Sequence, residues 1–227
     1  MNEFLNAVLA VLLGLSVAGV VLLASVIAYY FYTRERRRVQ GIARVAKHLG
    51  LEFSGWNEMD LLFECRNFKA FGLGDDEWTL NAVHGRKPFG NVSIFDYRYV
   101  LKINEAALRE FRRTYACLIL PQSFNHVMVR PENVLDKVSA MAGLDDINFE
   151  SERFNQEYFI SADNKKSAYE VVTPGIMNCL LRHKGLHMEV GGNYVLVHRK
   201  RLLSSAEFIE MYHVLEQIGE ALADKGC

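Results

Sequence analysis

The stretch from Phe4 to Thr33 constrains this chain most, because its thirty residues include no Asp, Glu, Lys, Arg, His or Pro. As a helix rising about 1.5 Å per residue it reaches ~45 Å, against roughly 30 Å of bilayer hydrocarbon. Globular helices seldom stay apolar on every face over such a length. The stretch therefore predicts a transmembrane helix that binds the lipid bilayer through residues 4–33, with Tyr29 to Tyr32 at one membrane interface.

A cleaved signal peptide is the main alternative for this segment. Such a peptide starts with basic residues and has a short apolar core. Here the chain starts Met-Asn-Glu, and the apolar run is about twice the usual length, although Val26-Ile27-Ala28 fits a cleavage site. We expect an anchor that stays in the membrane.

Arginines on one side of the span predict its orientation. Arg34, Arg36, Arg37 and Arg38 follow it directly, whereas no Lys or Arg precedes it. Positive flanks remain on the cytoplasmic side, and four widely spaced cysteines without a CxxC pair agree with a reducing compartment. We therefore expect a single-pass protein of the inner (plasma) membrane with a cytoplasmic C-terminal domain. The same arginines are candidates for contact with anionic headgroups.

The chain divides into an anchor and one domain of ordinary size. We expect a short extracytoplasmic N-terminus at residues 1–3, the span at 4–33, a basic flank and connecting helix at 34–50, and a soluble domain at 51–227. The net charge of −1 combines −1 at Glu3, +3 over residues 34–38 and −3 over residues 39–227. A mildly acidic domain argues against a nucleic-acid partner.

Residue patterns predict an α+β fold for the domain, with an antiparallel sheet packed by helices. Residues 104–113 fit either a short helix or the end of one long hairpin, and we favour the hairpin. Ser204 to Ala223 combines a capping box with an apolar stripe, which predicts a long terminal amphipathic helix. The other expected elements are helices at 57–65 and 131–143, a strand at 156–162, a helical region from Asp163 that restarts at Thr173-Pro174, and a hairpin at 186–199 that turns at Gly191-Gly192-Asn193.

Several short landmarks share an order along the chain. They are Phe95-Asp96-Tyr97, Leu120-Pro121, Arg130-Pro131-Glu132, Phe149, Phe154 with Tyr158, Thr173-Pro174 and the Gly-Gly hairpin before the last helix. Together, across residues 39–220, they resemble a group of uncharacterised bacterial membrane-anchored proteins. The resemblance implies the hairpin at 104–113 and a bacterial source, and it implies no activity.

Candidate chemistry is sparse. The sequence has no GxxxxGK[ST], GxGxxG or GxSxG motif. His183 and His187 have the spacing of a helical metal pair, but Gly185 is expected to end the helix between them. Cys117 lies in an apolar run and is expected to be an inert buried thiol. We expect no catalytic residue, no metal and no cofactor.

Two places remain as candidate sites. Asp96 and Tyr97 are candidates for binding a ligand, because a carboxylate on a largely apolar strand needs a partner, although alternation puts the two on opposite faces. Arg199, Lys200 and Arg201 are candidates for the membrane surface. Unchanged liposome binding after all three become Ala would contradict the second prediction.

These observations favour an interaction or scaffold module held at the cytoplasmic membrane face, with a membrane protein as its candidate partner. The alternative is an unrecognised enzyme or small-ligand-binding domain that acts near the membrane. A pocket holding Asp96 beside a histidine would favour the alternative, whereas scattered histidines would favour the module. The sequence does not fix an oligomeric state.

Overall fold

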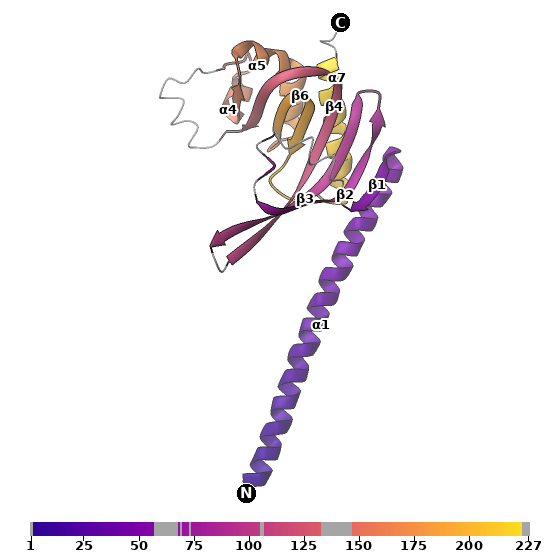
Figure 1. The fold of residues 1–227 in the computed structure, drawn as a ribbon, viewed down its shortest axis with the longest axis vertical. Coiled ribbons are helices and arrows are strands. Elements are labelled where there is room, and N and C mark those ends of the chain that lie inside the picture. Colours follow the sequence, from indigo (N-terminus) through magenta and orange to yellow (C-terminus); the bar gives the residue numbers. More distant parts are fainter. Residues whose placement is uncertain are drawn as a thin grey trace. The chain divides into compact units, whose positions relative to one another are not determined.

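The computed structural model describes residues 2–56, 68, 70–72, 74–104, 107–132 and 147–223. The chain forms two compact units, residues 1–41 and residues 42–227. Helix α1 (Asn2–Leu49) makes up the first unit and supplies the first residues of the second (Figure 1). The expected helical connection after the span is confirmed, and Gly50 follows its end with φ 61°, a conformation that suits glycine.

Among the described residues, one helix is long and apolar enough to cross a membrane. The candidate span begins at Leu12 within α1, its most apolar window has a mean hydropathy of 2.3, and none of that window is buried. An all-apolar, unburied surface of this length is unfavourable in water and favourable in hydrocarbon. The membrane anchor predicted from the sequence therefore has the required helix.

The second unit is built on an antiparallel sheet, which confirms the α+β class. The strands follow the order β1-β2-β3-β4-β5, and β6 pairs with β4 as well. Their bounds are β1 Glu52–Trp56, β2 Asp75–Lys87, β3 Gly90–Asn104, β4 Ala107–Pro131, β5 Tyr158–Ala162 and β6 His187–His198. The helices of this unit within the described residues are α4 Glu152–Glu157, α5 Lys165–Val171, α6 Pro174–Arg182 and α7 Ser205–Ala223.

The hairpin predicted at residues 104–113 is confirmed. β3 and β4 pair from Asn91↔Ile119 outward to Asn104↔Ala107, with one irregularity near the tip. Helix propensity favoured the alternative, a short helix at residues 104–113. The long ladder of cross-strand pairs outweighs that propensity. The pair projects from the sheet as a two-stranded ribbon (Figure 1).

The hairpin predicted at residues 186–199 is wrong. β6 is one strand from His187 to His198, and it pairs with β4 at Val127↔Val190 as well as at Leu118↔Val195. Gly192, with φ 59°, lies opposite Phe124 where the register shifts. A glycine at positive φ serves a bulge as well as a turn, so the Gly-Gly-Asn run bends the strand without reversing it. Figure 1 shows β4 arching over at the same end of the sheet.

Helix caps explain most of the remaining elements. Thr173 caps α6 with Pro174 in its first turn, and Ser204 with Glu207 forms the capping box of α7, as predicted. The strand expected from Gln156 instead starts at Tyr158, because Ser151 caps the short helix α4 in front of it. The helix expected at 57–65 and most of the one expected at 131–143 lie outside the described residues, while Pro131 itself ends β4.

The two faces of the sheet bury different side chains. A large aliphatic core, which includes Ile94, Leu118 and Val197, joins the sheet to α5, α6, α7 and the end of α1. The other face carries an aromatic cluster, defined here as Phe71, Phe95, Tyr97, Tyr99 and Tyr115. Because side chains alternate along β3, Asp96 lies on the aliphatic side and Tyr97 on the aromatic side, as the sequence predicted.

Candidate functional site

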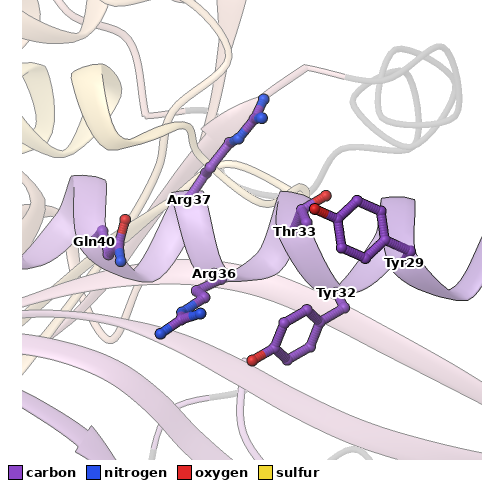
Figure 2. Close-up of a pocket in the computed structure, with 6 residues that line it drawn as sticks. All are labelled: Tyr29, Tyr32, Thr33, Arg36, Arg37 and Gln40. Atoms are coloured by element: carbon purple, nitrogen blue, oxygen red, sulfur yellow. The ribbon is translucent and has the colours of Figure 1, made fainter.

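One face of α1 carries the transition from apolar to charged residues. A shallow hollow there is lined by two aromatic rings, two guanidinium groups and two smaller polar side chains (Figure 2). Aromatic rings followed within two turns by arginines are typical of a membrane–water interface. Of the predicted basic membrane flank, Arg36 and Arg37 line this hollow, whereas Arg34 and Arg38 do not. The lining residues are Tyr29, Tyr32, Thr33, Arg36, Arg37 and Gln40.

Asp96 lies at the centre of a buried hydrogen-bond network. Its side chain is 2% exposed, Asn81 Nδ2 donates to its Oδ2 at 3.1 Å, and Thr114 Oγ1 donates to its Oδ1 at 2.7 Å. Thr114 Oγ1 in turn accepts from the backbone N–H of Leu203 at 2.9 Å. The carboxylate thereby ties β2, β3 and β4 to the residues that lead into α7. A ligand-binding role for Asp96 stays a prediction.

Tyr97 is fully buried on the opposite face. Its ring packs edge-on against Phe71 at 4.9 Å and against Tyr115 at 5.4 Å between centroids. Burial, reinforced by the nearby Glu77 carboxylate, raises the pKa of Tyr97 far above its usual value. The hydroxyl therefore stays protonated, and the structure does not bring Tyr97 and Asp96 together in one site.

The basic run after β6 is held against α7. Arg199 Nη2 lies 2.9 Å from Glu210 Oε1, and Arg201 forms an ion pair with Glu207. The Arg201 guanidinium lowers the pKa of Glu207 to about 2. Two of the three cations predicted at the membrane surface in this run thus have carboxylate partners within the domain, while Lys200 is exposed. Contact of this run with a membrane stays a prediction.

A pair of stacked histidines lies on the aromatic side of the sheet and was not predicted from the sequence. The rings of His187 and His198, at the two ends of the bent β6, lie 4.7 Å apart, and the His198 ring also packs on Tyr115. Burial lowers the pKa of His187 to about 4 and that of His198 to about 3, and the positive charges of Lys200 and Arg113 act in the same direction. Both rings are therefore neutral at pH 7. The sequence prediction treated β6 as two strands joined by a turn. It therefore did not indicate that one bent strand brings the rings of His187 and His198 together.

Other candidate groups do not converge on a metal site. His183 Nδ1 lies 3.0 Å from Glu210 Oε1, and His126 Nε2 lies 2.7 Å from Glu189 Oε1. Within the part of the chain that the structure describes, no three His, Cys, Asp or Glu side chains form a group that could hold a metal ion. The Cys117 thiol is buried, as expected.

The fold is shared with a protein of known structure. The chain resembles the crystal structure of the mycobacterial trehalose monomycolate transport factor A, TtfA, with a TM-score of 0.55 and 18% sequence identity. The match covers 82% of this chain and 95% of that one. At this identity the likeness shows the fold alone. No protein-family model matches the chain, and no curated protein matches it in sequence.

Proposed function

We propose that this chain is a membrane-anchored accessory factor in the transport of lipid-linked molecules, acting through a membrane protein partner on the cytoplasmic side of a bacterial inner membrane. The observation that carries the proposal is the combination of an apolar N-terminal helix with a fold whose solved counterpart is a transport factor, matched over nearly all of its length.

The described site geometry supports an accessory role over a catalytic one. Asp96 and the aromatic cluster stabilise the sheet, His126 and His183 are each hydrogen-bonded to a carboxylate, and His187 stacks on His198. Convergent titratable groups at one open surface are what hydrolytic or group-transfer chemistry requires. A module of this kind acts by binding, and its arginine flank and aromatic residues hold it at the bilayer.

Loss of the chain is expected to impair export of a lipid. We would delete it in its native host, pulse-label the lipids, and compare the inner membrane with the cell surface. The expected result is an unexported lipid precursor that accumulates until the full chain is restored. Residues 39–227 alone should fail to rescue, whereas the full chain with residues 4–33 replaced by an unrelated apolar span should succeed. An unchanged lipid distribution after deletion would contradict the proposal.

The proposed orientation makes a separate prediction. A C-terminal green fluorescent protein fusion should fluoresce and a C-terminal alkaline phosphatase fusion should be inactive, because the four arginines after the span stay in the cytoplasm. Replacing Arg34, Arg36, Arg37 and Arg38 with Gln, while adding lysines before Phe4, should reverse or mix the two signals. An active phosphatase fusion on the native chain would place the domain outside.

A further inference from the structure

The β3–β4 tip, defined as residues 101–104 and 107–113, exposes apolar side chains that the proposed function does not use. Ile103 is 60% exposed and Leu108 is 73% exposed. Among the described residues outside α1, Tyr169 is the other large apolar side chain with comparable exposure, at 47%. The tip therefore presents its aliphatic residues to the surroundings, where a soluble domain normally has polar ones.

The tip is a two-stranded ribbon beyond the rest of the sheet (Figure 1). In the described ladders, β2 pairs with β3 as far as Val100, and β6 pairs with β4 as far as Tyr115. Two strands alone are marginally stable in water. Here the stacked rings of Tyr99 and Phe111, 5.2 Å apart, brace the base of the ribbon. The fold therefore stabilises a projection whose far end buries little of its own apolar surface.

The segment that carries these aliphatic residues has a net positive charge. The Arg98 guanidinium lies 2.8 Å from Glu110 at the base, and that of Arg109 lies 4.9 Å from the centre of the Phe111 ring. Charged edge residues also protect an unpaired strand from aggregation, but that role needs no exposed aliphatic side chain at the tip. Within residues 101–113, in a domain of net negative charge, the cations Lys102, Arg109, Arg112 and Arg113 outnumber the carboxylates Glu105 and Glu110.

We propose that the β3–β4 tip is a second membrane contact, which inserts Ile103 and Leu108 into the headgroup region of an anionic bilayer. Aliphatic side chains ringed by Lys and Arg are the composition of interfacial anchors, which combine apolar burial with attraction to acidic lipid. Protein-binding hot spots instead centre on Trp, Tyr and Arg. The inference rests on the membrane-anchored state proposed above, and it adds a second point at which the domain meets the lipid.

The test uses the full chain in vesicles, with a nitroxide spin label at Leu108→Cys. Cys65 and Cys227 are changed to Ser, and the buried Cys117 and Cys179 are kept. Collisions with oxygen and with a water-soluble nickel chelate report whether the label lies in lipid or in water. The matched control carries the label at Tyr169→Cys. The vesicles are either pure phosphatidylcholine or a phosphatidylcholine–phosphatidylglycerol mixture.

In the anionic vesicles, the label at position 108 should favour oxygen over the nickel chelate, and the label at 169 should not. Adding Lys102→Glu and Arg109→Glu should abolish that preference, as should pure phosphatidylcholine. Equal nickel accessibility at 108 and 169 in anionic vesicles would overturn the proposal. Protection at 108 in native membranes but not in vesicles would also overturn it, in favour of a protein partner.

The lipid-export measurement separates this inference from the proposed function. If the label at 108 stays in water while the native chain still restores export, the tip proposal fails alone. If deletion of the chain leaves lipid distribution unchanged, the proposed function fails, whatever the label reports.

Discussion

Replacing Asp96 with Ala is expected to lower the free energy of unfolding of the domain by about 3 kcal/mol, because it leaves two buried hydrogen-bonding groups without their acceptor. Those groups are the Asn81 amide, whose side chain is 4% exposed, and the fully buried Thr114 hydroxyl. Burial makes the loss large, since water cannot replace the carboxylate there. Urea denaturation of the full chain in nonionic detergent micelles, followed by circular dichroism, measures the change.

Glu110→Ala is the matched control for this substitution. It also removes a carboxylate from the sheet, but its ion pair with Arg98 lies at the surface, with the two side chains 42% and 37% exposed. Such a pair contributes at most about 1 kcal/mol. Equal losses from the two variants would show that the buried network is not stabilising. That result would favour Asp96 as a ligand-binding residue, and with it the alternative of an enzyme or small-ligand-binding domain.

The Asp96 network shows what the sequence could and could not predict about the site. Period-2 alternation was enough to separate Asp96 from Tyr97, because side-chain direction along a strand depends on neighbouring residues alone. The partners of the carboxylate lie 15 and 18 residues away, and the Leu203 N–H that completes the network lies 89 residues from Thr114. Only the strand register brings these groups together, and register depends on the whole fold.

The elements of the fold also fall into two groups, those that local sequence predicts and those that depend on non-local contacts. The apolar helix, the caps at Thr173 and Ser204, and the terminal helix depend on local sequence, and all were predicted. The β6 strand was misread because Gly192 at positive φ is compatible with both a turn and a bulge. What decides between them is pairing of both halves with β4, which is a non-local contact. The histidine stack follows from that choice and was missed with it.

Acidification is expected to destabilise the domain through the same stack. The unfolded chain binds a proton at each histidine near the ordinary pKa of 6.5, whereas the folded domain holds that of His198 at about 3. Between these values the unfolded state binds more protons, so the stability present above pH 6.5 is lost as the pH falls toward 3. One such group contributes roughly 1.4 kcal/mol per pH unit, or about 2 kcal/mol by pH 5. His187, whose pKa in the folded domain is about 4, acts in the same direction and contributes a similar amount down to about pH 5.

His198→Phe should remove about half of this pH dependence, because His187 keeps its share, and it keeps a ring against Tyr115 and His187. The reason is that Phe cannot take up a proton when the chain unfolds. His213→Phe is the control, because His213 is 53% exposed on α7 beside Glu216. Urea midpoints at about pH 7 and about pH 5 should lie about half as far apart for the first variant as for the native chain, and as far apart as in the native chain for the second. If His198→Phe loses as much stability on acidification as the native chain, the pH dependence comes from other groups, and the stack is simply part of the packing on the aromatic face.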